Sequence, residues 1–150
     1  MIATIQPSSL QGELYAPASK SSMQRACAAA LAAGGTTVIN NPGHSNDDKA
    51  ALGVIDALGA SVEQTDEQIT IKSTGIHARG NAVHCGESGL GIRMFTPLVA
   101  MNSGEISITG EGSLVTRPMD FFDEVLPQLG VAVSTQQGRL PLLVKGPLVP

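Results

Sequence analysis

Aromatic side chains are nearly absent from this sequence, which contains one tyrosine, three phenylalanines and no tryptophan in 150 residues. A hydrophobic core must therefore be built from alanine, valine, leucine, isoleucine and methionine, which suits helices packed closely against faces of small residues. The length is typical of one domain and is sufficient to bury such a core.

Cysteine and histidine are also scarce. The two cysteines, Cys27 and Cys85, are expected within a helix and at the end of a strand, which argues against a disulfide framework or a zinc site. We predict that both thiols are buried and unreactive. His44, His77 and His84 share no metal-ligand spacing, so we assign them no role and expect neither a metal nor a cofactor.

Charge of one sign does not accumulate anywhere along the chain. The 9 basic and 13 acidic residues give a net charge of −4, and no basic stripe with interleaved aromatics is present, which excludes a general nucleic-acid binder. The longest apolar run, residues 26–33, is too short to cross a bilayer, and residues 1–5 lack the basic start of a signal peptide. We therefore predict a cytoplasmic protein without nucleic-acid or membrane partners.

Two cations flank the start of a predicted helix over residues 20–33. The first turn of a helix has free N–H groups and the positive end of the helix dipole, so Lys20 and Arg25 there favour a small acidic ligand. Ser21 and Arg25 are four positions apart and share one helix face. Taken alone, Lys20 could equally be a solvated lysine, Ser21 a helix cap and Arg25 a partner of a surface carboxylate.

The second half of the sequence repeats the first. Aligning Arg25 with Arg93 and Leu58 with Leu129 shows a repeat of about 70 residues. In the first copy we predict strands over 12–15, 36–40, 61–64 and 68–72, with helices over 20–33 and 47–58. In the second we predict strands over 82–85, 105–109, 131–135 and 140–144, with helices over 88–101 and 118–129. The fold class is thus α/β (α+β), with two βαβαββ units whose first helices are surrounded by protein.

A glycine-rich loop and an arginine mark the second copy. Gly86, Gly89 and Gly91 precede its first helix and allow a ligand to approach the backbone, although their spacing matches neither a phosphate loop nor a dinucleotide fingerprint. Arg117 precedes Pro118 and combines a guanidinium with free N–H groups at another helix start. The alternative for Arg117 is a surface arginine in a mobile loop.

The segment around Lys20, Pro-Ala-Ser-Lys-Ser-Ser-Met-Gln-Arg-Ala over 17–26, resembles the amino-terminal motif of the 5-enolpyruvylshikimate-3-phosphate synthase family. Three further stretches support the resemblance in the same order: Ser-Asn-Asp-Asp over 45–48, Cys-Gly-Glu-Ser-Gly-Leu-Gly-Ile-Arg over 85–93, and Thr-Gly at 109–110 followed by Arg-Pro at 117–118. It covers essentially the whole chain.

The resemblance implies a fold of βαβαββ units, three to a globular domain and two domains to an enzyme. Residues 1–150 would be a partial amino-terminal domain, with one unit over about 12–73, a second over about 81–145 and the start of a third at 146–150. Residues 2–5 would associate with the other domain.

The resemblance also implies a reaction: the enolpyruvyl group of phosphoenolpyruvate is transferred to shikimate 3-phosphate and phosphate is released, with no metal or cofactor. It assigns Lys20, Ser21 and Arg25 to shikimate 3-phosphate, and Lys20, Gly89 and Arg117 to phosphoenolpyruvate. The acid–base groups would lie in the remainder of the enzyme, which becomes a required partner, so we expect these 150 residues alone to be inactive.

Several residues near these motifs receive other interpretations. Glu87 and Leu90 stand where the family usually has Asn and Thr, and we hypothesise that they weaken phosphoenolpyruvate-like inhibitors such as glyphosate. Arg93 is interpreted as a structural ion-pair residue. Asp47 and Asp48 are assigned to the start of the second helix, where Ser45 and Asp48 form a capping box.

Two other functions stay open. One is a related enolpyruvyl transferase acting on UDP-N-acetylglucosamine, although that family has Lys-Asn where this chain has Lys20 and Ser21. The other is a non-catalytic binding or assembly module made of two repeats.

Overall fold

The computed structural model describes residues 2–148, and every structural statement below refers to these residues. The elements occur in the order α1 (Lys20–Ala33), β1 (Gly35–Asn40), α2 (Asn46–Ala57), β2 (Ser61–Gln64), β3 (Gln68–Ser73), β4 (Ala82–His84), α3 (Gly89–Val99), β5 (Glu105–Thr109), the 3-10 helix η1 (Gly112–Thr116), α4 (Phe121–Val125), the 3-10 helix η2 (Leu126–Leu129), β6 (Ala132–Ser134) and β7 (Leu142–Lys145).

Two sheets carry the same strand order. The first half of the chain, residues 20–73, forms an antiparallel sheet in the order β1-β3-β2, and the second half, residues 82–145, forms β4-β5-β7-β6. In the second sheet β5, β7 and β6 repeat the first arrangement, and β4 adds a parallel strand beside β5. The mixed α/β fold class predicted from the sequence is confirmed.

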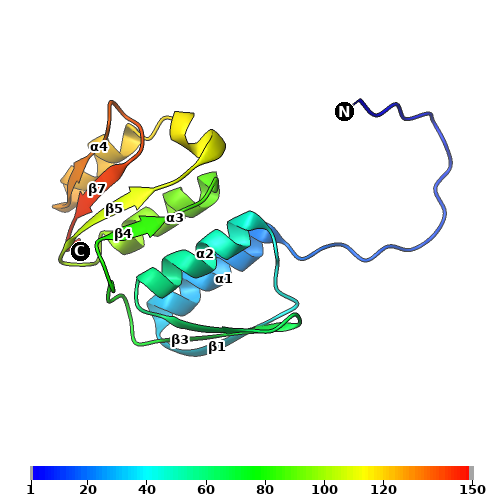
Figure 1. The fold of residues 1–150 in the computed structure, drawn as a ribbon, viewed down its shortest axis with the longest axis horizontal. Helices are drawn as coiled ribbons and strands as arrows, with labels where there is room; N and C mark the ends of the chain where they lie inside the picture. The colour runs from blue at the N-terminus through cyan, green and yellow to red at the C-terminus, as the bar shows by residue number, and fades with distance from the viewer. Residues whose placement is uncertain (1, 149–150) are drawn as a thin grey trace.

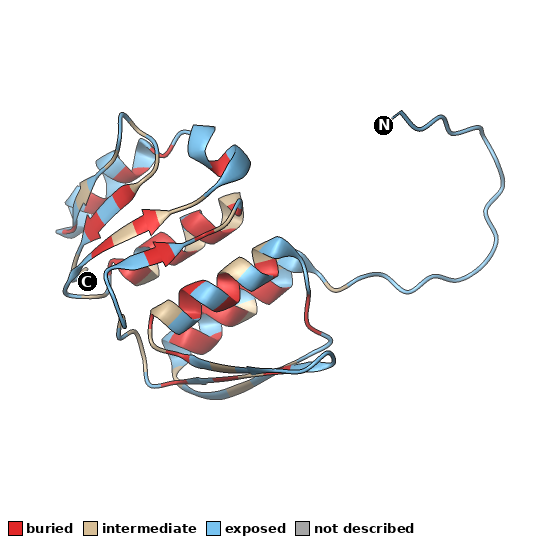
Figure 2. Ribbon diagram, in the orientation of Figure 1, coloured by how far each residue is buried: buried red, intermediate tan, exposed pale blue. Residues whose placement is uncertain are grey.

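The helices α1, α2 and α3 lie between the two sheets (Figure 1). α1 packs on β1 and β3, α2 contacts β2 and β4, and α3 contacts β5 as well as both other helices. Their facing sides form the buried band that Figure 2 shows through the middle of the molecule. This arrangement brings the N-terminal ends of α1 and α3 into direct contact through the side chains of Gln24 and Ser88.

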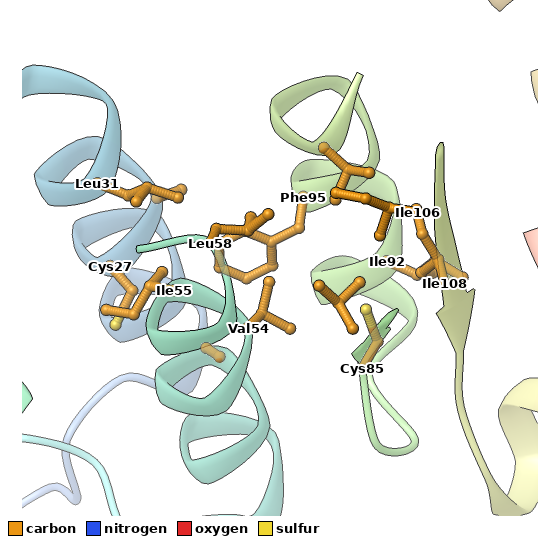
Figure 3. Packing of buried hydrophobic residues seen from close by; sticks show 14 of the residues in the cluster. Cys27, Leu31, Val54, Ile55, Leu58, Cys85, Ile92, Phe95, Ile106 and Ile108 are labelled. Atoms are coloured by element: carbon orange, nitrogen blue, oxygen red, sulfur yellow. The ribbon is translucent and has the colours of Figure 1, made fainter. Parts of the chain in front are cut away.

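The core consists mostly of aliphatic side chains, as the scarcity of aromatics predicts. Phe95 of α3 is its largest fully buried side chain, and Figure 3 shows its ring beside Leu58, which follows α2. Phe95 is 1% exposed and Leu58 is 0% exposed, so residues of both halves meet in one cluster. The predicted burial of Cys27 and Cys85 is also confirmed, with exposed fractions of 0% and 1%.

The predicted strand over residues 12–15 is wrong. These residues belong to an extended segment that runs away from the rest of the molecule (Figure 1). Leu14 is 85% exposed and Tyr15 is 102% exposed, because no strand pairs with this segment. A strand needs a partner for its backbone groups, and local sequence cannot supply one.

The helix predicted over residues 118–129 is also wrong in part. Only Phe121–Val125 is α-helical, and the chain then tightens into η2 at Leu126–Leu129. Pro127 has no N–H to donate, so the α-helical hydrogen-bond pattern does not continue through it. The backbone N–H of Met119 donates to the carbonyl of Gly138, which ties the segment before α4 to a distant turn. The 3-10 helix η1 before it was not predicted.

α1 is less enclosed than its composition predicts. Its buried residues are Met23, Gln24, Cys27, Ala28, Ala30 and Leu31. Arg25 and Ala29 are exposed, so one face of α1 contacts no other element of residues 2–148. Within the same residues, none of the helices has the length and apolar character needed to cross a membrane.

Candidate anion-binding site

α1 begins at Lys20, with Ser19 as its N-terminal cap. The Ser19 hydroxyl accepts a long hydrogen bond of 3.4 Å from the backbone N–H of Ser22. Ser21 is therefore not the cap, and the capping alternative for Ser21 is wrong. The first turn of α1 contains no acidic residue, so no side chain within that turn balances the positive end of the helix dipole.

α3 begins in the same way and is tied to α1. The Ser88 hydroxyl accepts from the backbone N–H of Gly91 at 2.9 Å and donates to Gln24 Oε1 at 3.0 Å. Both side chains are buried, with exposed fractions of 2% for Ser88 and 0% for Gln24. This bond fixes the two helix starts relative to each other. Sequence analysis missed Gln24, and a polar residue within an otherwise apolar helix was the signal available.

Arg117 lies directly over Gly89 at the start of α3. A Cβ atom at Gly89 would overlap Arg117 Nη1, so a side chain at this position would have to displace the guanidinium. Arg117 Nη2 also donates to Ser113 Oγ at 3.2 Å, which holds the arginine against η1. A guanidinium and the free N–H groups of a helix start thus face the same space, an arrangement suited to an oxyanion.

Arg93 does not form the predicted ion pair. Its Nη1 donates to the carbonyl oxygen of Gly89 at 2.9 Å, one turn earlier in α3. The ion pairs formed by residues 2–148 are Lys20 with Asp47, Lys72 with Glu63, and Arg79 with Asp56. Arg93 therefore braces the backbone at Gly89 instead of neutralising a carboxylate.

These residues surround a pocket of about 430 Å³, which we call the helix-start pocket. It is lined by Lys20, Ser21, Asp47, Glu87, Gly89, Leu90, Ser113 and Arg117. Four of the predicted ligand-binding residues thus line one space, although they come from three separate parts of the sequence. The fifth, Arg25, lies one turn further along α1, is exposed and is not part of this lining.

Lys20 is paired within the pocket. Its Nζ lies 2.8 Å from Asp47 Oδ2, in the first turn of α2. The hydrogen bond that Lys20 donates to Asp47, followed by the charge of Asp47, raises the pKa of Lys20 above the usual value of 10.5. A positive charge at the start of α1 is therefore balanced by a residue from α2.

The assignment of Asp47 to a helix cap needs correction. Asp48 completes the predicted capping box, because its Oδ2 accepts from the backbone N–H of Ser45 at 2.9 Å and its own N–H donates to Ser45 Oγ at 3.3 Å. Asp47 takes no part in that box and points its carboxylate to Lys20. Of two adjacent acids, one caps the helix and the other belongs to the pocket.

Glu87 adds a second carboxylate to the helix-start pocket. Its Oε2 accepts a long hydrogen bond of 3.4 Å from the backbone N–H of Ser113. A Cβ at Gly112 would overlap this carboxylate, and Gly112 has a φ of +54°, so glycine is needed there for both space and backbone conformation. The pocket therefore contains two cations, Lys20 and Arg117, and two carboxylates.

A larger hollow of about 630 Å³ adjoins the helix-start pocket and shares Asp47 and Glu87 with it. Lys49, His84 and Glu111 also line this hollow. His84 Nδ1 lies 3.1 Å from the backbone N–H of Gly86 and accepts from it. Residues 2–148 hold no cluster of three or more histidine, cysteine, aspartate or glutamate side chains suited to a metal ion.

The repeat fold, with two helix starts joined at an anion pocket, defines an enolpyruvyl-transferase-type α/β protein. An enolpyruvyl transferase from Streptomyces tendae has the same fold at a TM-score of 0.55 and 19% identity, over 85% of this chain and 30% of that one. A sequence model of EPSP synthase (3-phosphoshikimate 1-carboxyvinyltransferase) matches residues 5–149. The chain belongs to the EPSP synthase family.

Individual relatives agree with this membership. The 3-phosphoshikimate 1-carboxyvinyltransferase of Methanocorpusculum labreanum is 35% identical over 144 residues, which are 94% of this chain and 34% of the relative. That of Clostridium kluyveri is 33% identical over 97% of this chain and 34% of the relative. The EPSP synthase structure from Acinetobacter baumannii aligns at a TM-score of 0.80 and 26% identity, over 90% of this chain and 32% of that one. The chain thus spans about a third of the length of these relatives.

Proposed function

We propose that the helix-start pocket provides part of a site that transfers the enolpyruvyl group of phosphoenolpyruvate to shikimate 3-phosphate and releases phosphate. The observation that carries this proposal is that Lys20, Gly89 and Arg117 line one pocket, so that an ammonium, a helix start and a guanidinium border the same space. Family membership supports the reaction, and Lys20 and Arg117 bring positive charge to two anionic substrates in a pocket that also contains the carboxylates of Asp47 and Glu87.

We assign phosphoenolpyruvate to the side of the pocket formed by Gly89 and Arg117. Its phosphate suits a planar guanidinium held by Ser113, next to free N–H groups at the start of α3. Lys20 stands at the boundary between the two substrates. Holding two negatively charged molecules together in this way turns an unfavourable encounter into a positioned reaction.

We assign shikimate 3-phosphate to the start of α1. Ser21 lines the pocket and does not cap α1, so its hydroxyl is available to a phosphate. Arg25 is exposed on the same helix one turn later, where it can reach only the outer part of this ligand. The roles of Ser21 and Arg25 are therefore unequal in this proposal.

We propose further that the remainder of the enzyme supplies the acid–base groups, so the 150-residue chain alone has no turnover. The cytoplasmic location and the effect of Glu87 and Leu90 on inhibitors stay predictions. An enzyme acting on UDP-N-acetylglucosamine is disfavoured by the family match and by Ser21 after Lys20.

Ligand titration of the isolated chain, followed by its amide NMR spectrum, tests the proposal. Phosphoenolpyruvate is expected to shift signals near Gly89, and shikimate 3-phosphate is expected to shift those near Ser21, whereas UDP-N-acetylglucosamine should shift neither. In Arg117→Gln, loss of a charge-assisted contact should weaken phosphoenolpyruvate binding roughly 10- to 100-fold. Arg139→Gln is the matched control, because Arg139 is exposed and outside the pocket lining. Equal binding by the two variants would contradict the assignment.

A further inference from the structure

Asp47 already forms an ion pair with Lys20, one of the two cations of the helix-start pocket. Lys20 Nζ and Asp47 Oδ2 are 2.8 Å apart, and the Asp47 side chain is 19% exposed while that of Lys20 is 54% exposed. The pair joins the first residue of α1 to the first turn of α2. An anion that needs Lys20 therefore meets a carboxylate that is already bound there.

Asp47 can leave Lys20 without disturbing the start of α2. The capping box of that helix is made entirely by Ser45 and Asp48, whose side chains exchange hydrogen bonds with each other's backbone N–H groups. The Asp47 carboxylate takes no part in this box and acts on the start of α2 only through its negative charge in the first turn. The contact with Lys20 is thus separable from the folding of α2.

The structure also offers space for the displaced carboxylate. Asp47 lines both the helix-start pocket and the adjoining hollow of about 630 Å³. Lys49 lines that hollow too, so a carboxylate that turns away from Lys20 stays near a positive charge. Glu87 also borders both spaces. When an anion enters the smaller pocket, repulsion from Glu87 and from the anion favours movement of the Asp47 carboxylate out of it.

We propose that Asp47 is a resident counter-ion of Lys20 that an incoming oxyanion displaces. An ion pair this exposed is weak, so a doubly charged phosphate or sulfate can replace it, yet the pair still lowers the apparent affinity of every anion that uses Lys20. Asp47 would then raise the concentration of anion that is needed to fill the site. This role rests on the proposed function, because it concerns the same pocket and the same class of ligand.

Sulfate titration of the 150-residue chain at low ionic strength tests this role, because sulfate mimics a phosphate dianion and keeps its charge between pH 6 and 8. Asp47→Asn is expected to bind sulfate about two- to fivefold more tightly, the factor that an exposed ion pair is worth. Asp56→Asn is the matched control, since it removes the same charge from the same helix, at the Arg79 pair outside the pocket. Its affinity should stay within about 1.5-fold of the original.

Further variants separate competition from other effects. Asp47→Glu keeps the charge and should return the affinity to that of the original chain, whereas Lys20→Met should abolish the gain produced by Asp47→Asn. In the original chain, sulfate should also shift the carboxylate carbon signal of Asp47. If Asp47→Asn does not give a dispersed spectrum, Asp47→Ser replaces it, because serine is well tolerated near a helix N-terminus.

Several results would overturn the role of Asp47. Weaker sulfate binding by Asp47→Asn would show that Asp47 positions Lys20 instead of competing for its ligand. A gain equal to that of Asp56→Asn, or one that persists in Lys20→Met, would remove Asp47 from the site. If both substrates bind while Asp47→Asn matches the original chain, only this role fails. If sulfate behaves as expected but neither substrate binds, the proposed function fails instead.

Discussion

β1-β3-β2 of the first sheet and β5-β7-β6 of the second have the same strand order, but β1 and β5 differ in how far they are buried. β5 lies between β4 and β7, and its inward residues Ile106 and Ile108 are 1% and 0% exposed. The corresponding strand β1 pairs only with β3, none of its residues is buried, and Val38 is 49% exposed. A repeat in the sequence therefore sets which strands pair, whereas the burial of each strand depends on a neighbour that the repeat need not supply.

Replacing Phe95 by alanine should have the largest effect and would test whether the two halves unfold together. Phe95 belongs to α3 but lies beside Leu58 of the first half, so the cavity affects both (Figure 3). We expect a loss of about 3–5 kcal/mol in the free energy of unfolding, measured by denaturant titration. Hydrogen exchange should show β3 and β5 losing protection together.

Phe121→Ala is the control for that substitution, because Phe121 is 39% exposed and its ring pairs with that of the neighbouring Phe122. Its cost should be clearly smaller. Retained protection of β3 in Phe95→Ala, with loss confined to β5, would show that the halves are independent in stability.

Serine caps allow a sharper comparison of the helix starts. Ser45 is part of a reciprocal capping box, whereas Ser19 accepts only one hydrogen bond of 3.4 Å. Ser45→Ala should lower the free energy of unfolding by about 1 kcal/mol, and Ser19→Ala by a few tenths of that, as measured by thermal or denaturant unfolding. Equal losses would mean that the exposed start of α1 is as firmly capped as that of α2.

The smallest expected effect is a pH dependence from Lys20, the first residue of α1, where α3 begins with Gly89. Asp47 raises the pKa of Lys20 above 10.5 in the folded chain, so the stabilisation is complete below pH 10.5 and is lost as pH rises through the higher folded value. Melting temperatures between pH 8 and 11.5 should therefore fall slightly more for the original chain than for Asp47→Asn. Parallel curves would show that the pair contributes nothing to folding.

Local signals in the sequence determined the best-predicted elements. The bounds of α1, β2 and β5 agree with those predicted, because glycines or polar turns terminate these segments and their apolar pattern is regular. Elements that depend on distant partners were predicted less well. Residues 12–15 form no strand because no strand pairs with them, and the helix expected over residues 118–129 is interrupted because Pro127 has no backbone N–H to donate.

The residues of the candidate site also divide into those that local sequence motifs identified and those that depend on distant contacts. Lys20, Ser21, Gly89 and Arg117 were identified from sequence motifs, and the fold brings them around one pocket. The helix start expected after Arg117 does not form, because Arg117 ends η1 and α4 begins only at Phe121. The links between them were not predictable from spacing, since Gln24 and Ser88 are 64 positions apart and Asp47 reaches Lys20 from a different helix. Side-chain contacts between elements depend on how the helices pack, which no local pattern encodes.

The helix-start pocket is made from residues that lie far apart along the chain, from Lys20 to Arg117. A ribosome makes the amino-terminal part of a protein first, so the first sheet can form while the second is still being synthesised. The anion pocket, in contrast, has no complete wall until the segment carrying Arg117 has emerged and packed on α3. The helix-start pocket is therefore completed only after all residues of the first sheet have been synthesised.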